Sequence, residues 1–215
     1  AAAGVGTIGI VDDDNVDLSN LQRQVIHATE SISRPKVESA AETIARINPD
    51  VTVETHHQRL DVENALELIG SYDLVTDGSD NFATRFLVND AAYLAGKTLV
   101  SGAILRFDAQ LSTYRAHLGG DNPCYRCLFP APPPPGSVPS CAEAGVLGAL
   151  CGMIGSLQAT EVIKELVGSE ESLSGSLLIV DGLRTEFRKV KIRPDPACAL
   201  CGAQATITDL SAHAA

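Results

Sequence analysis

The chain has 215 residues, of which 45% are hydrophobic and 20% are charged, and its formal net charge at pH 7 is −11. These proportions are typical of a folded globular protein and exclude a disordered chain. The negative charge argues against nucleic acid as the main substrate. No apolar run is long enough to span a membrane and no secretion signal opens the sequence, so we expect a cytoplasmic protein without membrane association.

Strands alternate with helices over the first hundred residues. Residues 1–6 are typical of a frayed helix end with a glycine C-cap. We expect strands at 7–11, 51–54, 73–76 and 97–101, and helices at 61–69 and 84–95. A further helix is predicted to begin with Ser33 as N-cap and Pro35 in its first turn. This alternation predicts an α/β fold with a Rossmann-like, doubly wound, mostly parallel sheet.

The second half of the chain has a different pattern. Residues 110–116 alternate like an exposed strand, and the proline-rich run 131–139 indicates an extended loop. A long helix is expected at 143–167. Residues 177–180 and 186–192 are typical of antiparallel strands, so antiparallel strands are expected to complete the C-terminal part of the sheet.

Two acidic pairs follow predicted strands, Asp12 with Asp14 and Asp77 with Asp80. In a doubly wound sheet, ligands bind at the carboxyl ends of the strands, and a carboxylate there accepts hydrogen bonds from a ribose diol. Helix capping or turn formation is the alternative for a single Asp. Two such pairs at one sheet edge favour a nucleotide site.

Two cations lie between these acidic pairs in the sequence, Arg23 and Lys36. Lys36 falls at a predicted helix N-terminus, where a cation opposes the helix dipole unless an anion lies nearby. A bound phosphate is one explanation, and an ordinary solvated lysine is the alternative.

Four of the six cysteines form two C-x-x-C pairs, which are Cys124 with Cys127 and Cys198 with Cys201. Four thiolates suit a closed tetrahedral Zn²⁺ site with a structural role, and two redox-active pairs are the alternative. Cys141 precedes the predicted long helix, where a thiol has a lowered pKa and is a candidate nucleophile.

Seven segments together resemble the MoeB/ThiF family, relatives of the ubiquitin-activating enzymes. They are DDDNVDLSNLQRQ at 12–24, SRPKVESA at 33–40, TDGSDNFATR at 76–85, PCYRC at 123–127, SCAEAGVLG at 140–148, GSLQATEVIK at 155–164 and CALCG at 198–202. The resemblance implies an enzyme that uses ATP to adenylate the C-terminal glycine carboxylate of a ubiquitin-like sulfur-carrier protein of the MoaD/ThiS type, releasing pyrophosphate. The pathway would be molybdenum-cofactor, thiamine or related sulfur-transfer biosynthesis.

The resemblance also implies roles for individual residues. Asp12 would hold the ATP ribose, Asn20 and Arg23 would contact the phosphates, and Lys36 would stabilise charge near the α-phosphate. Asp80 would hold Mg²⁺ with Asn81 beside it, and Asp14 and Ser19 complete the expected nucleotide-binding set. Relatives that form a carrier thioester or an acyl persulfide use the Cys at the position of Cys141.

The same resemblance sets the expected organisation. We expect an adenylation domain at 1–206 and a tail or linker at 207–215, leading to a rhodanese-type sulfurtransferase domain. A Gly-rich ATP loop and an Arg donated by the second subunit of a homodimer are expected upstream. A crossover loop at about 129–141 would pass over the carrier's tail, and Arg106, Arg115 and Arg126 would face an acidic carrier.

Two other classes of function remain open at this point. An NAD-dependent oxidoreductase would fit the fold. Two expectations argue against it: the chain lacks a G-x-G-x-x-G fingerprint, and the pair Arg23 and Lys36 is directed to phosphate. A non-catalytic scaffold subunit would also fit. Retention of Asp12, Arg23, Lys36 and Asp80 argues against it.

Overall fold

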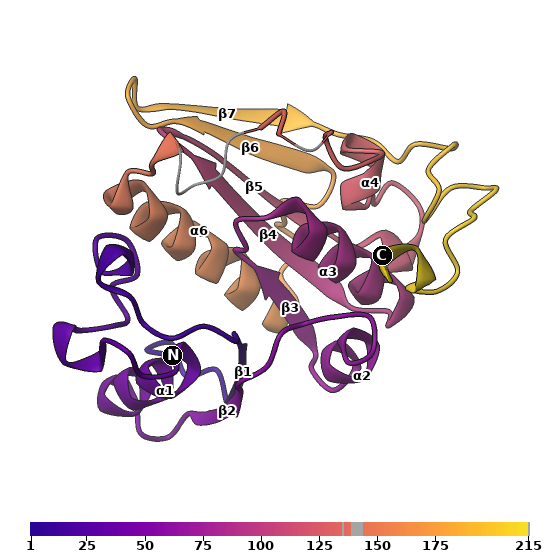
Figure 1. Cartoon of the computed structure of the whole chain (residues 1–215). Coiled ribbons are helices and arrows are strands. Elements are labelled where there is room, and N and C mark those ends of the chain that lie inside the picture. The colour runs from indigo at the N-terminus through magenta and orange to yellow at the C-terminus, as the bar shows by residue number, and fades with distance from the viewer. Residues whose placement is uncertain (135, 139–143, 215) are drawn as a thin grey trace. The chain divides into compact units, whose positions relative to one another are not determined.

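The computed structural model describes residues 1–134, 136–138 and 144–214. The chain divides into two compact units, Ala1–Leu60 and Asp61–Ala215. Figure 1 colours the chain from its N-terminus to its C-terminus. Among the described residues, none of the helices is long and apolar enough to cross a membrane.

The first unit is built on two parallel strands. β1 (Thr7–Val11) pairs with β2 (Thr52–His56), with Thr7 opposite Thr52. The connection contains the short helices η1 (Leu18–Asn20) and η2 (Thr29–Ser31) and the helix α1 (Lys36–Ile47), which packs against β2. Both strands and the helix were predicted, because their apolar residues follow strand and helix periodicity.

The start of α1 differs from the prediction. Ser33 has a φ of 70°, Pro35 precedes the first helical residue, and the helix has no side-chain cap. The backbone is held by pairing instead, since the N–H of Ser33 donates to Val16 O at 2.8 Å and the N–H of Lys36 donates to Asp14 O at 3.0 Å. This pairing places Lys36 beside the acidic run that follows β1.

The second unit contains a five-stranded sheet in the order β3-β4-β5-β6-β7 (Figure 1). β3 and β4 are parallel, with Asp77 opposite Ser101, and the other pairings are antiparallel. The mixed α/β class is therefore confirmed, with more antiparallel pairing in this sheet than expected. The strands are β3 (Leu74–Asp77), β4 (Thr98–Leu105), β5 (Asp108–Tyr114), β6 (Ser176–Asp181) and β7 (Glu186–Lys191).

β5 is the central strand of this sheet and is mostly buried, so the prediction of an exposed strand here was wrong. Its polar residues are satisfied inside the unit. The hydroxyl of Ser112 donates to Ser176 O at 2.8 Å, and that of Thr113 lies 3.4 Å from a carboxylate oxygen of Glu161. Hydrogen-bonded hydroxyl groups can alternate with apolar residues in a buried strand.

Helices cover both faces of the sheet. Leu150 and Ile154 of α6 pack against Ala109 and Val180 of β5 and β6, while α3 contacts β3 and β4. The helix α6 begins at Gly148 rather than at 143, because residues 145–147 pair with Arg106 in the β4–β5 turn. The helices are α2 (Ala65–Gly70), α3 (Phe82–Leu94), η3 (Ala116–Leu118), α4 (Tyr125–Leu128), α6 (Gly148–Leu166) and η4 (Ser211–His213).

Candidate functional site

Three of the predicted nucleotide-binding residues of the first unit form a compact cluster of charged side chains. Nζ of Lys36 lies 2.6 Å from Oδ2 of Asp14 and 3.6 Å from Oδ2 of Asp12. Lys36 is only 9% exposed, so it is not the solvated lysine of the alternative interpretation. The protein's own carboxylates already supply the anion that a cation at the start of α1 requires. The position of Lys36 therefore does not by itself demand a phosphate.

The segment that carries Ser19, Asn20 and Arg23 is shaped by its own hydrogen bonds. The side chain of Asp17 accepts from the N–H of Ser19 at 2.8 Å, and Oδ1 of Asn20 accepts from the N–H of Asp17 at 3.2 Å. Nη1 of Arg23 donates to the carbonyl of Ser19 at 3.0 Å. The structure thus gives Ser19 and Asn20 local roles in a turn and leaves Arg23 partly exposed.

His27 lies within reach of the charges of this cluster. Burial lowers the pKa of His27, and the positive charge of Lys36 lowers it further. Its Nδ1 is 2.9 Å from the hydroxyl of Ser39. We therefore expect a neutral imidazole at neutral pH, which leaves Lys36 as the cation of this cluster.

In the second unit, residues 77–81 form a loop at the carboxyl end of β3, which we call the Asp80 loop. Asp77 is 5% exposed. Its carboxylate accepts from the N–H of Ser79 at 2.9 Å and from the hydroxyl of Ser101 at 3.2 Å. Asp80 is exposed to solvent. The two predicted acidic residues therefore differ, because Asp77 shapes the loop and Asp80 is accessible to a ligand.

The next residue, Asn81, caps α3. Its Oδ1 accepts from the N–H of Thr84 at 2.8 Å, as expected of an Asn N-cap. Capping was the structural alternative for Asp80, and the geometry assigns that role to Asn81. The Asp12–Lys36 cluster and the Asp80 loop belong to different units.

The four cysteines of the two C-x-x-C pairs lie together, with all sulfur atoms within 4.8 Å of one another. The Sγ–Sγ distances are 3.8 Å for Cys124–Cys127, 3.6 Å for Cys124–Cys198 and 3.4 Å for Cys127–Cys201. None of the four is joined in a disulfide in the structure. The four residues could hold one metal ion.

The environment of the cysteines favours bound metal. Hydrogen bonding to Cys127 raises the pKa of Cys124, with burial adding to the effect, whereas hydrogen bonds from Cys124 and Cys201 lower the pKa of Cys127 to about 2. Close packing of the thiols therefore opposes the presence of several thiolates at once. A bound cation would remove that repulsion, since thiolates are the metal-binding form.

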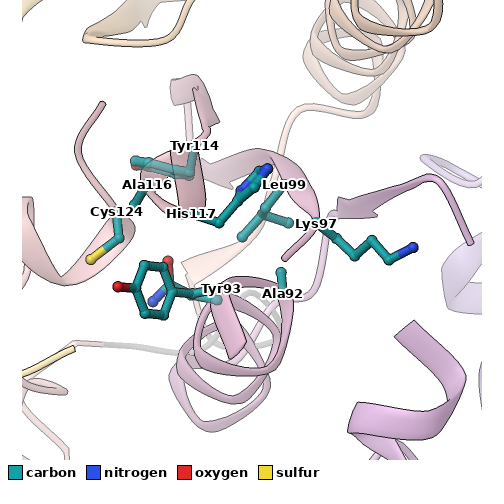
Figure 2. Close-up of a pocket in the computed structure, with 9 residues that line it drawn as sticks. Ala92, Tyr93, Lys97, Leu99, Tyr114, Ala116, His117 and Cys124 are labelled. Carbon is teal, nitrogen blue, oxygen red and sulfur yellow. The ribbon is translucent and has the colours of Figure 1, made fainter. Parts of the chain in front are cut away.

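A small cavity lies beside this cluster and has room for about one water molecule. Figure 2 shows Tyr93, His117 and Cys124 around it. Burial raises the pKa of Tyr93, with the neighbouring thiols adding to the effect, and burial lowers that of His117. The cavity is far too small for a nucleotide.

Two of the three arginines expected to face a carrier are engaged elsewhere. Nη2 of Arg126 is 2.7 Å from Oδ2 of Asp90, and Nε of Arg115 is 2.7 Å from Oε2 of Glu165. Both pairs are largely buried, so this expectation was wrong for Arg115 and Arg126, while Arg106 is exposed. Cys141 lies outside the described residues.

The pattern G-x-G-x-x-G does occur, at residues 4–9, so the expectation that the chain lacks it was wrong. However, its last three residues lie inside β1. A dinucleotide fingerprint instead forms the turn between a strand and the helix that follows it. This match therefore gives no support to an NAD site.

Comparison with known proteins identifies the family. Residues 1–200 match the ThiF family. The chain belongs to the ThiF family. The "Sulfur carrier protein adenylyltransferase" of Thermus thermophilus is 52% identical over 211 residues, which cover 97% of this chain and 78% of that relative.

Other ThiF-family relatives are longer. A "Probable adenylyltransferase/sulfurtransferase MoeZ" of Mycobacterium tuberculosis is 54% identical over 198 residues, and an "Adenylyltransferase and sulfurtransferase MOCS3" of Anopheles gambiae is 48% identical over 211 residues. The matches cover 92% and 98% of this chain but 50% and 47% of the relatives. The chain thus spans about half the length of these two proteins.

Solved structures of Escherichia coli MccB share the ThiF-family fold of this chain. One has a TM-score of 0.79 at 19% sequence identity, covering 93% of this chain and 61% of that one. At this identity the similarity concerns the fold alone.

Several residues of this ThiF-family chain acquire roles that sequence reasoning missed. Arg85 and Gln158 contact the Asp80 loop or the strands that frame it. Nε2 of His213 lies 2.7 Å from Oδ2 of Asp90, so the segment predicted as a tail packs on this unit. Both residues belong to motifs that resemble the family, so the motifs could have drawn attention to Arg85 and Gln158. The sequence around each residue does not indicate its hydrogen-bond partners.

Proposed function

We propose that this chain uses ATP to adenylate the C-terminal glycine carboxylate of a ubiquitin-like sulfur-carrier protein, with release of pyrophosphate. The observation that carries the proposal is the 52% identity, over 97% of the chain, to an enzyme named as a sulfur carrier protein adenylyltransferase. Molybdenum-cofactor, thiamine or related sulfur-transfer biosynthesis would be the pathway served.

The chemistry suits the available side chains. An ionised carboxylate attacks the α-phosphate without a general base, so catalysis requires alignment of the reactants and neutralisation of charge. Lys36 has three N–H donors and can keep its contact with Asp14 while it donates to a phosphate oxygen. Arg23 would bind a second phosphate.

The remaining first-unit residues would hold the nucleotide. Asp12 would accept hydrogen bonds from the ribose hydroxyls, because a carboxylate can bind both. Asp14 would orient the Lys36 ammonium through its 2.6 Å contact. Ser19 and Asn20 would contact phosphate through the turn that they form.

Asp80 is proposed as the Mg²⁺ ligand. A carboxylate oxygen is the donor that Mg²⁺ prefers, and the ion usually takes only one or two carboxylates plus phosphate and water. The exposed side chain of Asp80 fits that need, with the Asn81 amide beside it. Bound Mg²⁺ would neutralise charge on the phosphates during transfer.

We propose that Cys124, Cys127, Cys198 and Cys201 bind one structural Zn²⁺. A tetrahedral Zn²⁺ with Zn–S bonds of about 2.3 Å requires sulfur atoms about 3.8 Å apart. The observed distances of 3.4 to 3.8 Å come close to that value. With four Cys ligands the shell is closed, so we assign the metal no catalytic step.

Elemental analysis of freshly purified, reduced protein tests the zinc site. We expect one zinc per chain, and removal by a chelator should lower the melting temperature because metal binding is coupled to folding. Protein that contains no stoichiometric metal would exclude the site.

The proposed partners follow from the same activity. The carrier's glycine tail would lie under the crossover loop, and Cys141 would act after adenylation, in sulfur transfer. A homodimer and a sulfurtransferase, in the same chain or a separate one, complete the proposal. We also propose a cytoplasmic location, because a site of four metal-binding thiolates suits a reducing compartment.

Carrier-dependent ATP–pyrophosphate exchange tests the function in the full-length protein. We expect Asp80→Asn to lower the exchange rate about a thousandfold, since a metal-positioning carboxylate contributes several kcal/mol to transition-state stabilisation. The exposed Asp121 provides the matched control, and Asp121→Asn should leave the rate unchanged. Wild-type protein that binds the carrier without any exchange would favour the scaffold alternative instead.

A further inference from the structure

In the Asp80 loop, hydrogen bonds hold the residues before and after Asp80, whose side chain is exposed. We propose that Arg85 and Gln158 are positioning residues, which fix the backbone of this loop so that the Asp80 carboxylate is presented to Mg²⁺. This inference rests on the proposed function, because it concerns how the Mg²⁺ ligand is oriented. Neither residue is expected to touch the metal or the nucleotide.

Arg85, on the first turns of α3, holds the residue before Asp80. Its Nε and Nη2 donate to the carbonyl of Ser79 at 3.0 and 2.7 Å. Both bonds of this charged fork are thus directed at one neutral backbone oxygen. Hydrogen bonds from a charged donor are stronger than neutral ones, so the guanidinium restricts the Ser79–Asp80 peptide more than one neutral donor would.

Gln158, in the middle of α6, holds the base of the loop. Its Nε2 donates to the carbonyl of Asp77 at 2.8 Å and to that of Val100 at 2.9 Å. Asp77 is the last residue of β3, and Val100 lies within the neighbouring parallel strand β4, where the next residue, Ser101, pairs with Asp77. One amide group therefore joins the end of β3 to β4.

Gly102 leaves the space that Gln158 occupies. A Cβ at Gly102 would lie 3.2 Å from Oε1 of Gln158 and 3.4 Å from Cγ2 of Ile154. The first distance is tighter than ordinary van der Waals contact, so a larger residue would press on the amide. The absence of a side chain at Gly102 on β4 therefore makes room for the Gln158 amide on α6.

Together these contacts fix the backbone of the loop on both sides of Asp80. Residues 77 and 79 are held by Gln158 and Arg85, and Asn81 is held by its cap of α3. The Asp80 side chain between them is exposed. A ligand on a fixed backbone loses less conformational freedom when it binds a metal, and a shift of about 1 Å can cost a hundredfold in rate.

The test measures exchange in the full-length protein as a function of Mg²⁺ concentration. For Arg85→Met and Gln158→Met we expect about a hundredfold loss at limiting Mg²⁺, with part of the rate recovered at high Mg²⁺. Arg85→Lys keeps the charge but loses the fork and should retain an intermediate rate. Arg46→Met, at an exposed position on α1, serves as the control without effect.

A double-mutant cycle with Asp80→Asn separates this inference from the proposed function. If Arg85 acts through Asp80, Arg85→Met should cause no further loss in the Asp80→Asn background. An unchanged Mg²⁺ dependence in both the Arg85 and Gln158 variants, with or without a lower melting temperature, would overturn the inference while leaving Asp80 intact. An Asp80→Asn protein with normal exchange would instead remove the proposed Mg²⁺ role itself.

Discussion

Gly202, which directly follows the last cysteine of the proposed zinc site, provides a sharp test of the local geometry. A Cβ at this position would lie 2.5 Å from Cys198 O, 2.6 Å from Pro196 O and 2.7 Å from Cys198 N. All three are backbone atoms, which cannot move aside as a flexible side chain can. Gly202→Ala must therefore displace the turn that carries Cys198.

The expected cost follows from these contacts. Overpacking in a tight site typically costs about 1–3 kcal/mol, and three backbone contacts below 3.0 Å place this substitution near the upper value. A loss of about 3 kcal/mol should lower the melting temperature by about 6–12 °C in a protein of this size. Displacement of Cys198 should also weaken zinc binding by about 10- to 100-fold.

Differential scanning calorimetry and competition with a chromogenic zinc chelator measure both effects. Gly152→Ala is the matched control, because Gly152 lies inside α6 with no neighbouring atom within 4 Å of its Cβ position. That substitution should stabilise the protein by about 0.5–1 kcal/mol. If Gly202→Ala kept both the wild-type melting temperature and the wild-type zinc affinity, the argument from backbone contacts would be refuted.

Two further substitutions address buried charge and the order of the reaction. Asp90 is 0% exposed and is paired with Arg126 and His213. Asp90→Asn should lower the free energy of unfolding, measured in urea, by about 3–5 kcal/mol, because it leaves a buried guanidinium without its counter-charge. A loss below about 1 kcal/mol would contradict this account. Cys141→Ala should leave ATP–pyrophosphate exchange nearly intact and reduce only later sulfur transfer, because adenylation precedes any thiol step. Collapse of exchange in folded Cys141→Ala protein would show that the two steps are not separate.

Features encoded over a few neighbouring residues were predictable from the sequence. The alternation of strands and helices follows from periodicities of two and 3.6 residues, which act within one element. The two C-x-x-C pairs indicated their common site because each spacing brings two sulfurs together on a short turn. The family resemblance was equally accessible, since it depends on motifs in their order along the chain.

Contacts between distant residues were decided only by the tertiary structure. Lys36 pairs with Asp14 across 22 residues, Arg126 with Asp90 across 36, and Gln158 reaches Asp77 across 81. No local pattern distinguishes these partners from solvent or from a ligand, which is why Lys36 suggested a phosphate and Arg126 an acidic carrier. In the same way, alternation along β5 indicated two different faces but not what would cover them. Burial and charge pairing depend on which elements pack together, and that packing brought Arg85 and Gln158 to the Asp80 loop.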